Sequence, residues 1–444
     1  MFVVQTANLI SDESKIPIDV YVVAYPGGII ESVLDYVLDQ RLRRSLRWMY
    51  GVCTSVRLLI KYLQSNPTQT CDAKTLVNFA ERLLFGSVDS SLGRDLTELF
   101  WKPSGPDVTN TILAFLRGYF EYICSDEAKP LSTGWVSSHD RLCALAGFIY
   151  RRDRALLGHL WEGGSGGPYG ELRIRYGTVA NRDPPAFPED RFDDLINDGY
   201  RVGNKHDLRG ILGVLLMDGA GFRASETMHL FTSDVRPDPD NPKSALVRIH
   251  HPQFGEAPSD WEDFSGKRIV GNRIQYLESQ WGLVPRNRVN SKLHAGWKGG
   301  LLDGKYYKEA HWFLPERGEM FMRYWLLYMR QLATIRRLHP YALVNLEKTT
   351  VGKIYCLDEQ YKAHQRACRR IGLTPSKETG VSPHGHRHAY GKRLSDGECS
   401  EKLIQICLHH SDIASQEVYT QLSSKTIRSG LEDAVKKIEK KYSV

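Results

Sequence analysis

A stretch rich in glycine and proline at 163–188 interrupts this chain and separates two long segments of different character. It contains GGSGGPYG at 163–170 and the prolines of RDPPAFPED at 182–190. Glycine weakens helices and strands and proline breaks them, so neither element is expected to persist here. We therefore interpret 163–188 as a linker. Because 444 residues suffice for about two to four domains, the linker predicts a domain on each side.

The segment before the linker has the apolar spacing of a small helical domain. In RLRRSLRWMYGVCTSVRLLIKYLQ, apolar side chains recur at alternating steps of three and four, which predicts one apolar helical stripe. Four helices are expected, at 41–64, at 75–85, from Asp107 onward and within 136–161. Joined by short loops, they indicate a helical domain over 28–162, with 1–27 as an N-terminal extension.

Four arginines crowd the start of the helix predicted at 41–64: Arg41, Arg43, Arg44 and Arg47. Positive charges at that end oppose the helix macrodipole. Two interpretations stay open: a solvated polar face, or a surface that meets phosphates. The net charge of the whole chain, +7, is compatible with nucleic-acid binding.

The composition excludes several classes of protein. A hydrophobic fraction of 41% with 25% charged residues is ordinary for globular domains and excludes disordered, collagen-like and fibrous chains. No stretch approaches the ~20 apolar residues of a membrane span, and the N-terminus lacks the basic and apolar regions of a secretion signal. The 8 cysteines form no CxxC pair, which argues against a zinc ribbon and predicts reduced thiols in a cytoplasm.

Beyond the linker the pattern becomes mixed. Helices are predicted at 205–217, from Phe222, and at 316–338, 355–371 and 401–408, with a basic helical tail at 425–441. Strand-like runs at 244–250 and 309–314 flank a stretch, 252–300, that has no clear periodicity. The chain is thus expected to be mainly α with a small β-sheet, an α+β protein.

Four fragments of the second segment contain side chains suited to chemistry. They are GAGFRASETMHL with Arg223 and Glu226, SPHGHRHAYG with His384 and Arg387, LHHSD with His410, and VYTQ with Tyr419. Each alone has an ordinary explanation: a surface ion pair, a structural histidine or a core tyrosine. The histidines could also hold a metal ion, since imidazole is the commonest metal ligand.

In this order the four fragments resemble the tyrosine recombinase, or phage integrase, family. That family has an arginine that opens a helix with an acidic residue three positions on, a His-x-x-Arg box, a later histidine or tryptophan, and a tyrosine nine residues after it. Here Tyr419 lies 9 residues after His410, and Arg387 precedes His410 by 23. HQRACRRIGLTP at 364–375 is similar to the segment before the His-x-x-Arg box. The helical domain at 28–162 resembles the family's core-binding domain, which clasps the duplex opposite the catalytic domain.

The resemblance implies a nucleophile and two phosphate clamps. Tyr419 would attack a DNA phosphodiester and store the bond energy in a phosphotyrosine linkage, because a phenol of pKa ~10 can later be expelled. Arg223 and Arg387 would hold the non-bridging oxygens as planar forks. Glu226 would orient the helix that carries Arg223.

The resemblance also implies proton-transfer groups. His384 would assist proton transfer at the tyrosine, and His410 would donate a hydrogen bond to the phosphate. In the family a lysine of a β-hairpin protonates the departing 5′-oxygen, and GWKGGLLDGKYYKEAHWFLP is similar to that hairpin and the strand after it. Lys298 is the first choice for this lysine and Lys305 the second, while Lys267 in FSGKRIV stays an alternative.

The chain departs from the family pattern in three places. The interval of 75 residues between the first arginine and the chosen lysine is longer than the family's, which implies an insertion near 252–295 in a catalytic domain over 189–444. His386 stands where the family favours leucine, and His409 where it favours glycine. His409 would therefore enter its turn without the freedom of glycine at positive φ.

The resemblance implies a site-specific DNA recombinase, or integrase, of a mobile genetic element that works through a 3′-phosphotyrosine intermediate. Its expected partners are double-stranded DNA and further copies of itself, which would form a tetramer on paired sites. Accessory DNA-bending or directionality factors are further candidate partners. No cofactor, metal ion or membrane is expected, and the location would be the cytoplasm, at the nucleoid. The alternatives are a type IB topoisomerase, a catalytically silent DNA-binding protein of the same fold, and a histidine-cluster metal protein.

Overall fold

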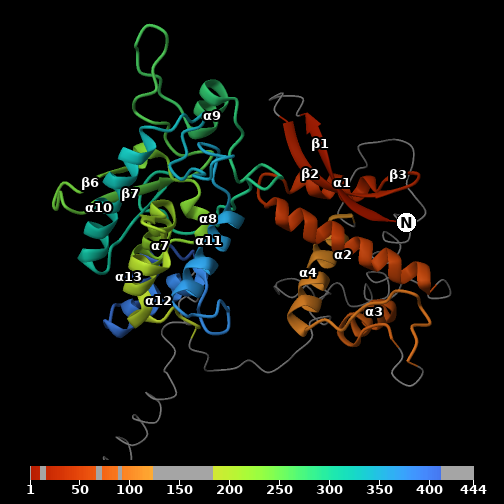
Figure 1. Ribbon diagram of the computed structural model, residues 1–444. Coiled ribbons are helices and arrows are strands. Elements are labelled where there is room, and N and C mark those ends of the chain that lie inside the picture. The colour runs from red at the N-terminus through yellow and green to blue at the C-terminus, as the bar shows by residue number, and fades with distance from the viewer. Residues whose placement is uncertain (1, 11–16, 67–72, 89–92, 124–183, 412–444) are drawn as a thin grey trace, which may run out of the picture. The chain divides into compact units, whose positions relative to one another are not determined.

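The computed structural model of the protein describes residues 2–10, 17–66, 73–88, 93–123 and 184–411 (Figure 1). The chain divides into two compact units, Met1–Thr178 and Val179–Val444. The helix expected within 136–161, most of the predicted linker, the tail at 425–441 and Tyr419 lie outside the described residues. None of the described helices is long and apolar enough to cross a membrane.

The first unit combines a small antiparallel sheet with helices. Its elements are β1 (Val3–Ile10), β2 (Pro17–Tyr25), β3 (Gly28–Ile29), α1 (Glu31–Asp39), α2 (Leu46–Ser65), α3 (Ala73–Phe85) and α4 (Pro106–Ile123). Strand β2 lies between β1 and β3 and pairs antiparallel with both, with Val3 opposite Ala24. Helices α2, α3 and α4 confirm three of the expected helices, whereas β1, β2 and α1 were not expected.

Strand β2, within the predicted N-terminal extension, contributes to the core of the first unit. Its residues Val20, Val22 and Val23 are buried in one cluster with Met49 and Val56 of α2. Adjacent residues of a strand point to opposite faces, so the burial of both Val22 and Val23 means that both faces of β2 are covered here. The strands and the helices of this unit therefore share one hydrophobic core.

Helix α2 begins later than the apolar pattern predicts. Its N-cap is Ser45, whose hydroxyl accepts a hydrogen bond from a backbone N–H of the first turn (3.3 Å). Arg41, Arg43 and Arg44 therefore lie before the helix and are exposed. Only Arg47 stands in the first turn, where its charge opposes the macrodipole.

The second unit is built from helices and short strands around one buried helix, α7. Its elements are η3 (Glu189–Arg191), α6 (Phe192–Asp194), η4 (Leu195–Gly199), β4 (Arg201–Val202), β5 (Lys205–His206), α7 (Leu208–Ala220), α8 (Ala224–Thr227), η5 (Thr232–Asp234), β6 (Val235–Pro237), β7 (Ala245–His250), α9 (Arg273–Trp281), β8 (Tyr307–Glu309), α10 (Pro315–Leu332), α11 (Leu357–Arg370), α12 (Pro383–Asp396) and α13 (Glu401–Cys407). Strand β7 lies between β6 and β8 and pairs antiparallel with both.

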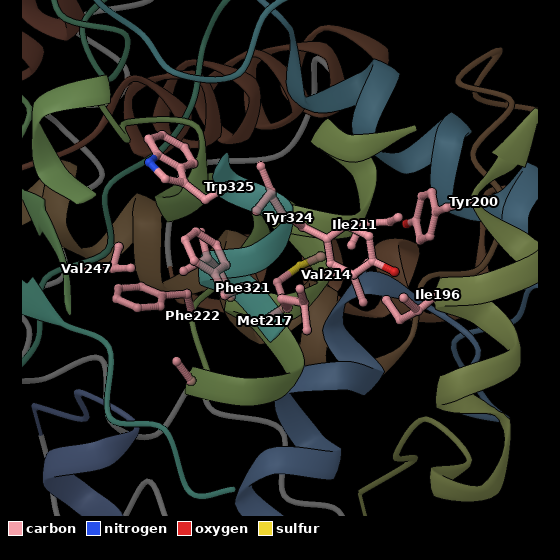
Figure 2. Packing of buried hydrophobic residues seen from close by; sticks show 14 of the residues in the cluster. Ile196, Tyr200, Ile211, Val214, Met217, Phe222, Val247, Phe321, Tyr324 and Trp325 are labelled. Atoms are coloured by element: carbon pink, nitrogen blue, oxygen red, sulfur yellow. The ribbon is translucent and has the colours of Figure 1, made fainter. Parts of the chain in front are cut away.

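Helix α7 forms the centre of the second unit. Every residue from Arg209 to Ala220 is buried, as expected for a helix that is apolar on all sides. Figure 2 shows Met217 of α7 packed beside Phe321 of α10. The sequence predicted that this helix ends at residue 217, but α7 continues to Ala220, and Gly221, with a φ of 67°, provides a left-handed C-cap.

The helices predicted at 316–338, 355–371 and 401–408 correspond to α10, α11 and α13 with shifted boundaries. Strand β7 matches the run at 244–250, but β8 covers only the start of the run at 309–314. Helix α9 lies within the stretch at 252–300, where no element was expected. The described residues are mainly helical with small antiparallel sheets, which confirms the α+β class.

Candidate active site

Arg223 and Glu226 form a hydrogen-bonded ion pair at the start of α8. Arg223 is the N-cap, with extended backbone, immediately after the left-handed turn at Gly221. One carboxylate oxygen of Glu226 accepts from the backbone N–H of Arg223 (2.9 Å), and the other accepts from its guanidinium (3.0 Å). Because Glu226 is fully buried, both the backbone and the side chain of Arg223 have a fixed anchor.

Lys308 of β8 joins this pair, although the sequence did not single it out. Its Nζ donates to Glu226 Oε1 (2.7 Å) and to the backbone carbonyl of Lys298 (3.1 Å). Burial opposes the ionisation of Glu226, but the charges of Lys308, Arg223 and Arg387 outweigh it and lower the pKa of Glu226 to about 2. Lys308 lies between Tyr307 and Glu309 in β8, and this local sequence gives no signal of burial, since lysine is almost never fully buried unless it is paired.

Replacing Lys308 with methionine should lower the free energy of unfolding by about 3 kcal/mol, because it removes a cation that is hydrogen-bonded to the buried carboxylate of Glu226. Both side chains of the pair are fully buried. Urea denaturation followed by circular dichroism measures the change. Lys305→Met serves as the control, since Lys305 is an exposed lysine only three residues away. Equal curves for the two variants would contradict a stabilising role for the pair.

Arg387 connects three segments of the second unit. It lies in the first half of α12 and is 2% exposed. One terminal nitrogen donates to the backbone carbonyl of Gly221, and the other donates to that of Leu408 (2.6 Å). The guanidinium is therefore held between the end of α7 and the turn that follows α13.

His384 and His410 come from different segments but experience the same positive charges. Partial desolvation lowers the pKa of His384, and Arg387, Arg223 and Lys298 lower it further. Burial and the same three cations lower the pKa of His410 to about 3. Both imidazoles are therefore neutral near pH 7, so each offers one N–H donor and one acceptor. Five of the predicted site residues thus lie within one electrostatic cluster.

The three candidate lysines occupy different surroundings. Lys298 is exposed, and its positive charge lowers the pKa values of both His384 and His410. The ammonium of Lys305 lies 6.0 Å from the ring centroid of Tyr306, which precedes β8. Lys267 lies in an exposed loop, where its backbone N–H donates to Asp263 (3.0 Å). The structure thus brings Lys298 to the cluster of arginines and histidines.

Part of this chain is similar in sequence to a known recombinase. A segment of 67 residues is 39% identical to the tyrosine recombinase XerD of Chlamydia pneumoniae, and the match covers 14% of this chain. The match supports the tyrosine recombinase family. It spans only 22% of that relative, and no family model matches this chain.

Solved structures of tyrosine recombinases superpose loosely on this chain. The XerH recombinase bound to a palindromic difH substrate is 12% identical, with a TM-score of 0.44, over 81% of this chain and 71% of that one. The Tn1549 transposon integrase with transposon right end DNA is 12% identical, with a TM-score of 0.38, over 85% and 98%. The XerA recombinase is 12% identical, with a TM-score of 0.35, over 91% and 98%.

His386, which stands where the tyrosine recombinase pattern favours leucine, has a structural explanation. Its side chain is fully buried, with Nδ1 2.9 Å from a carboxylate oxygen of Asp218 and Nε2 2.9 Å from Nε2 of His364. Its ring also stacks on Phe187, with 4.1 Å between centroids. These contacts involve α7 and α11 and lie on the side of α12 that packs into the core, so we assign His386 to the fold.

His409, which stands where the pattern favours glycine, adopts the positive φ that the sequence predicted. Its φ is 51°, in the left-handed region that glycine normally occupies. Its Nε2 lies 2.8 Å from Asp303, whose other carboxylate oxygen lies 2.8 Å from His311. Among the described residues, these three form a group whose potential ligand atoms lie within 4.8 Å of one another. They do not include His384 or His410, the histidines that the family pattern assigns to the site.

Proposed function

We propose that the protein is a site-specific DNA recombinase that cleaves and rejoins strands through a 3′-phosphotyrosine intermediate, for a mobile genetic element. The observation that carries the proposal is that the charges of Arg223, Arg387 and Lys298 act on both His384 and His410. The two arginines also act on the buried carboxylate of Glu226. These side chains come from four separate segments of the chain. Within the described residues they include two arginines with fixed guanidinia, which suits a phosphate better than a metal ion.

The chemistry assigned to each side chain follows from its charge and surroundings. Arg223 and Arg387 hold the two non-bridging oxygens of the scissile phosphate and stabilise the charge that develops there. The phenol of Tyr419 attacks phosphorus, its P–O bond forms, and the bond to the 5′-oxygen breaks. Neutral His384 accepts the phenolic proton, and the ammonium of Lys298 gives a proton to the departing 5′-oxygen.

DNA is the proposed partner of the first unit as well. Arg41, Arg43, Arg44 and Arg47 are exposed, so their charges are accessible to phosphates. Recombination requires four copies on two paired sites, whereas a topoisomerase acts as a monomer. Joined products from two labelled DNA sites would support recombination, and relaxation of supercoiled DNA without joined products would favour the topoisomerase alternative.

Formation of the covalent adduct should continue in excess EDTA without any nucleotide. The arginines supply the charge stabilisation that metal ions supply in other phosphoryl-transfer sites. The experiment incubates the protein with nicked suicide substrates and resolves protein–DNA adducts on a denaturing gel. An adduct that forms only after a divalent metal ion is added would contradict this mechanism and favour the histidine-cluster alternative.

A further inference from the structure

The carboxylate of Asp303 accepts three hydrogen bonds that link two segments of the second unit. Oδ1 accepts from Nε2 of His311 (2.8 Å), and Oδ2 accepts from Nε2 of His409 (2.8 Å) and from the backbone N–H of Glu309 (2.7 Å). Burial opposes ionisation, but these hydrogen bonds hold the pKa of Asp303 well below its usual range. An ionised carboxylate can only accept, so each histidine carries its proton on Nε2.

His409 is a strained and buried residue that the hydrogen bond to Asp303 holds in place. Its φ of 51° is unfavourable for a residue with a Cβ, and its ring is fully buried. The ring lies 5.5 Å from that of Phe222 and 5.8 Å from that of His311, measured between centroids. Within the part of the chain that the structure describes, Nε2 of this ring has a hydrogen-bond partner and Nδ1 has none. The bond to Asp303 is therefore the polar contact that orients this imidazole.

The segment that carries Asp303 also approaches the backbone of the turn. A Cβ added at Gly300 would lie 2.2 Å from the carbonyl oxygen of His409, so only glycine permits this approach. Gly300 lies two residues after Lys298, and His409 immediately precedes His410. The separation between Lys298 and His410 therefore depends on how these two segments are held.

We propose that Asp303, His311 and His409 form a clasp that positions Lys298 and His410 relative to each other. The clasp rests on the proposed function and deepens it. Asp303 is a positioning residue, since it acts through its neighbours and not on the phosphate. In this chain the clasp takes the place of the glycine that the tyrosine recombinase pattern favours at position 409, because the hydrogen bond and ring packing offset the strain of the left-handed turn.

Asp303→Ala should slow DNA cleavage at saturating substrate on the order of 10²-fold, the loss typical of a reactive group displaced by about 1 Å. DNA affinity should change less than about twofold, because the phosphate contacts are spread over many residues. Single-turnover cleavage of a suicide substrate and fluorescence anisotropy measure the two quantities. Asp263→Ala is the matched control, since Asp263 is an exposed carboxylate that also accepts several local hydrogen bonds.

Two further measurements distinguish positioning from a general loss of structure. A substrate with a 5′-bridging sulfur needs no proton from Lys298, so it should restore most of the cleavage lost in Asp303→Ala. In His409→Gly the turn adopts positive φ without strain, so adding Asp303→Ala to that background should slow cleavage less than tenfold. Asp303→Asn keeps an acceptor oxygen and should retain an intermediate rate, which provides a second variant if Asp303→Ala does not fold.

The possible outcomes separate a failure of the clasp proposal from a failure of the proposed function. If the wild-type protein forms a covalent protein–DNA adduct and all Asp303 variants cleave at the wild-type rate, the clasp does not position Lys298 and His410, while the proposed function stands. If the wild-type protein forms no adduct with its DNA site, the proposed function fails and the clasp with it. If EDTA slows the wild-type protein as much as Asp303→Ala does and zinc restores the rate, the three side chains hold a metal ion and the clasp is overturned.

Discussion

Replacing Tyr419 with phenylalanine should abolish the covalent protein–DNA adduct and leave DNA affinity nearly unchanged. The phenolic oxygen is the atom that would bond to phosphorus, and phenylalanine has no substitute for it. Binding depends on many contacts to phosphates and loses none of them. A suicide substrate resolved on a denaturing gel measures the adduct, and fluorescence anisotropy measures the affinity.

Tyr361→Phe is the control for this experiment, because Tyr361 is a partly exposed tyrosine on α11. It should form the adduct at the wild-type rate. An adduct in Tyr419→Phe at the wild-type level would show that another residue is the nucleophile. Peptide sequencing of the adduct would then identify that residue.

Lys298→Ala should slow cleavage by ~10²–10⁴-fold, the usual contribution of a general acid. The 5′-alkoxide is a poor leaving group unless it is protonated, so losing the ammonium raises the barrier to its departure. A 5′-bridging sulfur leaves as a thiolate without that proton. The sulfur substrate should therefore rescue Lys298→Ala but not Arg223→Ala, whose defect concerns the non-bridging oxygens. Single-turnover rates with the two substrates measure the rescue.

Lys305→Ala and Lys267→Ala provide the controls for this prediction. Lys305 lies beside Tyr306, and Lys267 lies in an exposed loop, so both variants should cleave at close to the wild-type rate. If the sulfur substrate rescues one of them while Lys298→Ala cleaves normally, the general acid is misassigned. Lys308 is not an alternative of this kind, because its ammonium is fully buried against Glu226.

The sequence by itself determined the parts of this protein that depend on local patterns. Apolar residues at steps of three and four predicted α2, α3 and α4, because the face that a helix buries has the period of the helix. The resemblance implied that Glu226 would orient the helix that carries Arg223, and the structure shows two hydrogen bonds between these residues within one turn. Replacement of the family's glycine by His409 predicted strain, which the positive φ confirms.

Only the tertiary structure decided which distant side chains share a site. Lys308 and Glu226 are 82 residues apart in the chain, and Asp303 and His409 are 106 apart. No periodicity extends over such intervals, since burial and pairing of a polar group depend on how separate segments pack. The same reason explains why a buried lysine in a short strand and an aspartate in a loop gave no signal in the sequence. Local patterns indicate which face of an element is buried, whereas the packing of the elements determines what that face meets.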